Sequence, residues 1–91
     1  MKAQMWNKSF WIEETNPQIL KLNYELLLVN SGFGICGFTE KHFKPFGFTA
    51  LYLLSESHLA IHTFPEADKT YIELSSCVKK PFDLFIKIHA I

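Results

Sequence analysis

Hydrophobic and polar positions along the chain predict short strands around one well-marked helix. A mixture of aromatic and polar residues over 5–13 favours a first strand. Asn16-Pro17 then marks a helix start, because Asn caps a first turn and the missing N–H of proline costs nothing there; Ser31-Gly32 ends the helix. A second helix is expected over 81–91, opening on a proline. Between the two helices lie three or four strand-like stretches, at residues 33–43, 46–54, 58–64 and 70–75.

The first predicted helix carries apolar side chains spaced three and four residues apart. This spacing is typical of the face that an amphipathic helix buries. The stripe consists of Ile19, Leu22, Leu26 and Val29, and it is widened by Leu20, Tyr24 and Leu27.

The order of the predicted elements indicates the fold class. Consecutive strands follow the first helix without the alternation that parallel sheets require, which favours an α+β protein. We therefore expect a two-layer sandwich, an antiparallel sheet with helices on one face, formed by residues 1–91 as a single domain.

Composition adds a constraint on assembly. A chain of 91 residues buries a modest share of its surface, yet 48% of this one is hydrophobic and it includes nine Phe. Part of that surplus is expected to cover a subunit interface.

Charge and segment length exclude several partners. Nine basic residues balance nine acidic ones, so no net field gathers nucleic acid or anionic lipid. We find no apolar signal core and no run near the ~20 residues of a membrane span, so a cytoplasmic protein is expected.

Two cysteines, Cys36 and Cys77, stand far apart in the sequence. In a cytoplasmic chain both are expected to be reduced. Neither has a second Cys within four residues, so no zinc knuckle is predicted.

The densest group of reactive side chains lies within residues 54–66. His58 and His62 share one face of a predicted strand, with Ser57 beside the first of them. A metal site with Cys77 is disfavoured, since strand residues four apart lie roughly 13 Å from each other. A thiol hydrolase pairing Cys77 with His62 is chemically sensible. The residues alone do not decide between these two interpretations. They also allow a third, in which the histidines and Cys77 are ordinary structural side chains.

The same segment resembles a known family. Residues 56–66, Glu-Ser-His-Leu-Ala-Ile-His-Thr-Phe-Pro-Glu, are similar to the self-cleavage segment of prokaryotic S-adenosylmethionine decarboxylases, with Phe64 in place of the usual Trp. Upstream, Phe43-x-Pro-x-Gly47 matches the strand that leads into it, and Cys77 follows at the family's spacing. Compared with that family, the chain is short at its C-terminus.

The resemblance implies that the chain cleaves itself between Glu56 and Ser57. Ser57 would attack the preceding carbonyl, and the resulting ester would eliminate to leave a pyruvoyl group, the self-generated cofactor. His62 matches the histidine that moves a proton during processing. Glu56 and Thr49 match positions that support processing, and no metal is implied.

Three further matches concern the substrate, S-adenosylmethionine. The pyruvoyl carbonyl would form a Schiff base with its amine, and Cys77 matches the acid that protonates the α-carbon after carbon dioxide leaves. Phe43 matches a ring that stacks on adenine, and Glu66 a carboxylate that accepts the ribose hydroxyls. The product would supply polyamine synthesis, and a homodimer of cleaved protomers is implied.

Two alternatives remain at the level of sequence. Relatives of this family can decarboxylate arginine with the same pyruvoyl chemistry. The chain could also be a shortened, non-catalytic homologue that acts as a binding or regulatory subunit.

Overall fold

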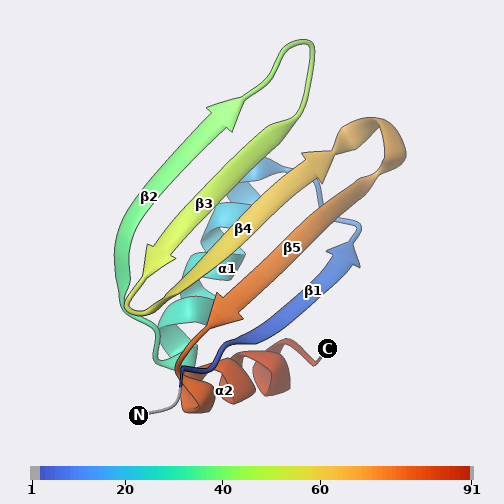
Figure 1. The fold of residues 1–91 in the computed structure, drawn as a ribbon. Helices are drawn as coiled ribbons and strands as arrows, with labels where there is room; N and C mark the ends of the chain where they lie inside the picture. Colours follow the sequence, from blue (N-terminus) through green and yellow to red (C-terminus); the bar gives the residue numbers. More distant parts are fainter. Residues whose placement is uncertain (1–2, 91) are drawn as a thin grey trace.

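The computed structural model describes residues 3–90, which form one antiparallel sheet and two helices on the same side of it (Figure 1). The expected α+β sandwich is confirmed. In chain order the elements are β1 (Trp6–Ile12), α1 (Pro17–Ser31), β2 (Ile35–His42), β3 (Phe48–Leu54), β4 (Ser57–Phe64), the short 3₁₀ helix η1 (Pro65–Ala67), β5 (Lys69–Ser76) and α2 (Lys79–His89).

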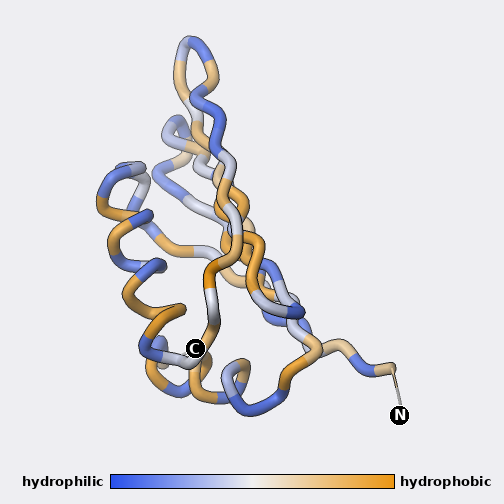
Figure 2. The backbone as a smooth tube through the Cα atoms, turned by 90° about the vertical axis from the view of Figure 1, so that its left-hand side faces the viewer, coloured by the Kyte–Doolittle hydropathy of each residue, from blue (hydrophilic) through white to orange (hydrophobic). Residues whose placement is uncertain are grey.

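The sheet has the strand order β1-β5-β4-β3-β2, and each neighbouring pair is antiparallel. Strands β2 to β5 follow one another as hairpins, and β1 pairs with β5 at the far edge. Seen from the side, the helices form a separate layer next to the sheet, on its left in Figure 2. One sheet face is therefore covered and the other is open.

The predicted boundaries agree with the structure to within about two residues at most strand ends. Asn16 caps α1 by accepting a hydrogen bond from the Ile19 N–H, and Gly32 ends the helix in the left-handed conformation. Helix α2 begins at Lys79 rather than at Pro81, so that the proline stands inside its first turn. Proline is tolerated there because the first turn has unpaired N–H groups in any case.

The core lies between the covered sheet face and the helices. Alternate residues of β3 point into it, as the strand's period of two requires. Helix α1 contributes Leu20, Tyr24 and Leu28. The complete buried apolar cluster is Leu20, Tyr24, Leu28, Phe33, Phe48, Ala50, Tyr52, Leu54, Leu59, Ile61, Ile72, Leu74, Phe82 and Phe85.

The prediction that the apolar stripe on α1 is its buried face is wrong. Ile19, Leu22, Leu26 and Val29 are all exposed, Leu22 to 60%. Two residues that were expected only to widen the stripe, Leu20 and Tyr24, face the sheet together with Leu28, which the predicted stripe did not include.

Within residues 3–90, neither helix is both long enough and apolar enough to cross a membrane.

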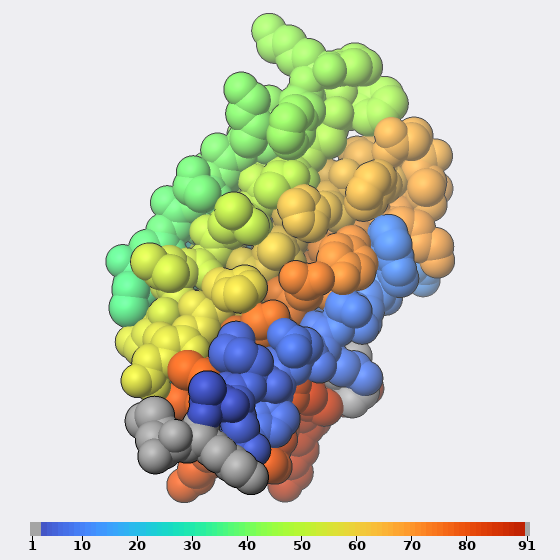
Figure 3. Space-filling view, viewed as in Figure 1, coloured from blue at the N-terminus to red at the C-terminus, as the bar shows by residue number. Residues whose placement is uncertain are grey.

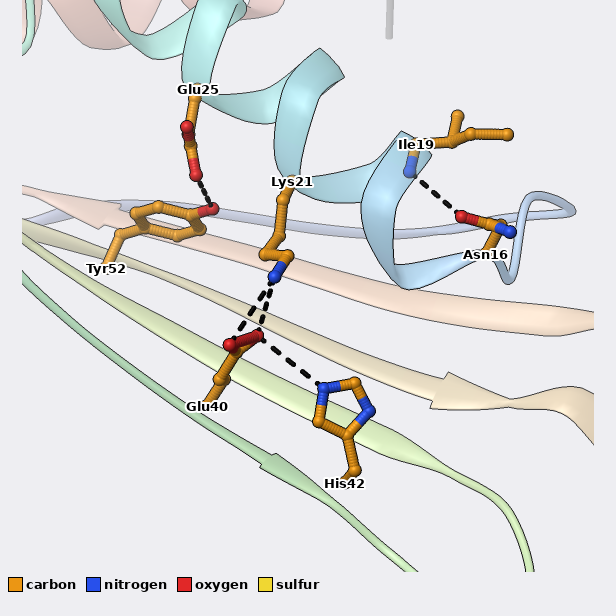
Figure 4. A network of polar contacts seen from close by, with 7 residues as sticks. All are labelled: Asn16, Ile19, Lys21, Glu25, Glu40, His42 and Tyr52. Atoms are coloured by element: carbon orange, nitrogen blue, oxygen red, sulfur yellow. Dashed lines mark hydrogen bonds and ion pairs between the residues drawn. The ribbon is translucent and has the colours of Figure 1, made fainter.

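Polar contacts between α1 and the covered sheet face hold the two layers in register (Figure 4). Tyr52 donates a hydrogen bond to Glu25 at 2.6 Å, and Lys21 pairs with Glu40 at 2.9 Å. Burial, followed by the bond to Glu25, raises the pKa of Tyr52 well above its usual range, so it remains a donor. These contacts are structural and lie on the opposite side of the sheet from the open face.

Candidate active site

The turn between β3 and β4 consists of Ser55 and Glu56 and leads directly into Ser57. Glu56 has φ of 60°, in the left-handed region that side chains other than glycine adopt at a cost of about 1–2 kcal/mol. The residue that precedes the predicted cleavage point is thus held in a strained conformation by the hairpin.

The carbonyl oxygen of Glu56 accepts two hydrogen bonds from a single residue, the one that directly follows β5. The Cys77 N–H lies 3.2 Å from it and the Cys77 Sγ lies 2.8 Å from it. Two donors aimed at one carbonyl oxygen polarise it and stabilise negative charge that develops there. Cys77 is itself exposed.

Ser57 lies beside this carbonyl and faces the covered side of the sheet. It is 7% exposed, and its Oγ donates to Ser76 Oγ at 2.7 Å. Sequence reasoning missed Ser76. Ser76 lies directly opposite Ser57 in the β4–β5 ladder, a register that no local sequence pattern indicates.

On the open face, Thr49 and His62 form a second pair. They are directly opposite each other in the β3–β4 ladder, and Thr49 Oγ1 lies 3.0 Å from His62 Nδ1. His62 also stacks on Tyr71, with ring centroids 6.3 Å apart. His58 points to the same face, as the sequence predicts, and is exposed.

The predicted substrate residues meet at the other end of the sheet. Phe43 and Glu66 line a pocket of about 260 Å³ together with Thr49, His62 and Phe64. Thr63 also lines the pocket, but its Oγ1 is buried and has no hydrogen-bond partner within the described residues. The pocket therefore combines aromatic surface with a carboxylate.

One chain does not bring these two groups of residues together. Ser57 and His62 stand five residues apart on β4, which corresponds to roughly 17 Å along a strand. Figure 1 shows the β3–β4 turn at one end of the sheet, and the 43–47 loop and η1 at the opposite end. Ser57, Glu56 and Cys77 form one cluster, and Phe43, Thr49, His62 and Glu66 form another.

Residues 3–90 contain no group of three His, Cys, Asp or Glu side chains that could hold an ion. Cys36 and Cys77 are both free; Cys36 Sγ lies 3.3 Å from Ser55 Oγ, on the other side of the turn.

The fold and the site define a two-layer α+β protein with Ser57 and Cys77 at a strained hairpin turn and a second cluster of candidate residues at the opposite end of the sheet. Residues 15–89 match the family model described as S-adenosylmethionine decarboxylase, and the chain belongs to this family.

Named relatives agree with this assignment. The chain is 47% identical over 47 residues to S-adenosylmethionine decarboxylase proenzyme 2 of Bacillus cereus, a match covering 52% of this chain and 38% of that protein. It is 36% identical over 62 residues to the S-adenosylmethionine decarboxylase proenzyme of Thermotoga maritima, covering 68% and 48%. The matched stretches thus span half or less of these relatives.

A solved structure shares the fold. The adenosylmethionine decarboxylase from Aquifex aeolicus superimposes with a TM-score of 0.74 and 17% identity, covering 96% of this chain and 81% of that one. At this identity the likeness concerns the fold.

Proposed function

We propose that this protein decarboxylates S-adenosylmethionine after it has cleaved itself between Glu56 and Ser57. The observation that carries the proposal is the pair of hydrogen bonds from Cys77 to the Glu56 carbonyl oxygen, directly beside the Ser57 hydroxyl. The names of the relatives, which describe proenzymes, support it.

The first step of cleavage follows from the geometry of the turn. Ser57 Oγ attacks the Glu56 carbonyl carbon, and the negative charge that forms on the carbonyl oxygen is stabilised by the Cys77 N–H and thiol. When the C–N bond breaks, the hydroxyl proton ends on the Ser57 nitrogen, and an ester joins the two residues. The strained Glu56 backbone favours this step because it raises the energy of the intact turn.

The remaining steps convert Ser57 into the cofactor. Loss of the α-proton and of the β-oxygen releases Glu56 with a free carboxylate. Addition of water and loss of ammonia then leave a pyruvoyl group on the second chain. The site fits this group, because serine offers a β-oxygen that is both nucleophile and leaving group, and Ser57 is buried beside a polarised carbonyl. When formed, the pyruvoyl group supplies an electron sink for decarboxylation.

The chain's own side chains would perform the other tasks. Cys77 is exposed next to the new chain end, where its thiol can deliver a proton to the substrate. Phe43 and Glu66 share a pocket that suits an adenine ring and two ribose hydroxyls. That combination favours a nucleoside over arginine, which has no ribose to bind.

A homodimer would complete the site. Since the Ser57 cluster and the Phe43 cluster lie at opposite ends of one sheet, a second copy related by a two-fold axis can bring one of each together. The open face, seen in Figure 3, offers a surface for this contact. It exposes Trp11, Leu51, Leu53 and Phe64, each by 43% or more.

Denaturing mass spectrometry tests cleavage directly. We expect two fragments, one ending at Glu56 and one beginning with a pyruvoyl group in place of Ser57, and an intact chain for Ser57→Ala. A wild-type chain that stays intact on prolonged incubation would contradict the proposal and favour the alternative of a non-catalytic homologue. Calorimetric titration of Ser57→Ala with S-adenosylmethionine and with arginine then separates the two substrates.

A further inference from the structure

Ser76 is the last residue of β5 and is fully buried. It lies directly opposite Ser57 in the β4–β5 ladder, so both side chains point to the covered face of the sheet. Among residues 3–90, Ser76 Oγ is the only hydrogen-bond partner of Ser57 Oγ, at 2.7 Å.

The hydrogen bonds of Ser76 fix the direction of this contact. A hydroxyl has one proton to donate and two lone pairs that accept. Ser76 donates its proton to the Val78 carbonyl oxygen at 3.0 Å and accepts from the Val78 N–H at 3.0 Å. Its remaining lone pair can only accept, so Ser57 must be the donor. The Ser57 proton therefore points at Ser76.

This direction matters for a nucleophile. With its proton held by Ser76, the Ser57 oxygen has its lone pairs free, and its side chain is confined to one rotamer. Confining a reacting group before the reaction removes part of the entropic cost of the transition state.

We propose that Ser76 is the positioning residue for the first step of self-cleavage, a role that rests on the function proposed above. It accepts the hydrogen bond of the Ser57 hydroxyl while Oγ attacks the Glu56 carbonyl carbon. The C–O bond forms, the C–N bond breaks, and the proton passes to the departing Ser57 nitrogen, so Ser76 is unchanged at the end.

Two consecutive residues, the last of β5 and the one after it, thus contact the two groups that react with each other. Ser76 holds the nucleophile from the covered side, and Cys77 holds the carbonyl that is attacked. Thr49 and His62 stand five residues along the ladder from this point, so within one chain the first contact of Ser57 is with Ser76.

The chain supplies a matched control for testing this role. Ser75 precedes Ser76, is similarly buried at 7% exposed, and donates to Asn7 Oδ1 at 2.6 Å on the other face. The variants are Ser76→Ala, Ser75→Ala and Ser76→Cys, each expressed as the full chain and followed by denaturing mass spectrometry after synthesis. Thermal unfolding checks that each variant is folded.

We expect Ser76→Ala to slow cleavage roughly 10- to 100-fold and Ser75→Ala to change it less than about twofold. Ser76→Cys retains a weak acceptor and should give an intermediate rate. Neutral hydroxylamine, which cleaves esters and leaves amides intact, should release less fragment from Ser76→Ala than from wild type, because the ester forms more slowly.

Each outcome decides a separate point. A folded Ser76→Ala that cleaves as fast as wild type overturns the role of Ser76 and leaves the proposed function standing. If Ser76→Ala does not fold, the rate of folded Ser76→Cys decides, and a wild-type rate overturns the role. A wild-type chain that never cleaves overturns both proposals.

Discussion

Cys77 illustrates how much depends on single hydrogen bonds at this turn. Its N–H and its thiol meet the same carbonyl oxygen, so the residue contributes one donor that substitution cannot remove and one that it can. The thiol is also the group expected to protonate the substrate. Substitutions at Cys77 can therefore separate cleavage from decarboxylation.

For Cys77→Ala we expect cleavage to slow about 10- to 100-fold, since the side-chain donor to the Glu56 carbonyl is lost and the backbone donor stays. Cys77→Ser keeps a hydroxyl donor and should cleave faster than Cys77→Ala. Its decarboxylation should nevertheless fall, because a hydroxyl is a much weaker acid than a thiol. Mass spectra over time measure cleavage, and release of carbon dioxide measures turnover. Equal cleavage rates for Cys77→Ala and wild type would show that the Cys77 thiol does not assist cleavage as a hydrogen-bond donor.

At the scale of single residues, the sequence motif placed Ser57 and Cys77 in one site, and the structure brings both to the Glu56 carbonyl. Ser76 was not predictable, because its bond to Ser57 depends on the register of β4 against β5, and no local pattern encodes a contact 19 residues apart. The roles of Thr49, His62, Phe43 and Glu66 stay predictions.

At the scale of elements, the strands and caps were predictable and the orientation of α1 was not. Asn16, Pro17 and Gly32 mark the ends of the helix through local chemistry that any context preserves. Periodicity could not choose between its faces, since leucines occur on both. The choice comes from tertiary packing, where Leu20, Tyr24 and Leu28 meet the sheet.

Matched truncations on α1 should show the difference between its faces. Leu28 is fully buried and Leu22 is 60% exposed. We expect Leu28→Ala to lower the free energy of unfolding by about 2–5 kcal/mol and Leu22→Ala by under about 0.5 kcal/mol. Urea denaturation in the uncleaved Ser57→Ala background measures both on a single chain. Similar losses for the two variants would contradict the observed orientation of the helix.

At the scale of the whole molecule, His89 joins three elements. From the end of α2 its Nε2 lies 2.7 Å from the Tyr24 hydroxyl on α1, and its ring packs edge-on against Phe10 of β1. Burial lowers the pKa of His89 below its usual value, because the charged form loses hydration.

A pH dependence of stability follows from that lowered pKa. As the pH falls below about 6.5, the unfolded chain gains a proton on His89 before the folded chain does, so the free energy of unfolding decreases. We expect Ser57→Ala to be less stable at pH 5 than at pH 7, and the added variant His89→Phe to reduce this difference. Urea titrations at both pH values measure it, and an unchanged difference in His89→Phe would exclude His89 as a cause.

Assembly can be tested by mixing inactive chains. Ser57→Ala cannot form the pyruvoyl group, and Glu66→Gln lacks the carboxylate of the substrate pocket. If each site takes one cluster from each copy, a mixed dimer holds one intact site, and equal amounts should recover about a quarter of wild-type activity. Co-expression followed by a carbon dioxide assay measures this. Activity no higher than the sum of the separate variants would contradict an active site that is shared between two copies.

The proposed cleavage point lies at a two-residue turn between adjacent strands, and this position affects whether the cleaved protein can refold. After cleavage β3 and β4 remain neighbours in the sheet but belong to separate polypeptides. Unfolding would release two molecules, and their reunion would slow with dilution. The newly made chain could thus fold by itself once, and a cleaved protein lost to heat or denaturant would be replaced by synthesis more readily than by refolding.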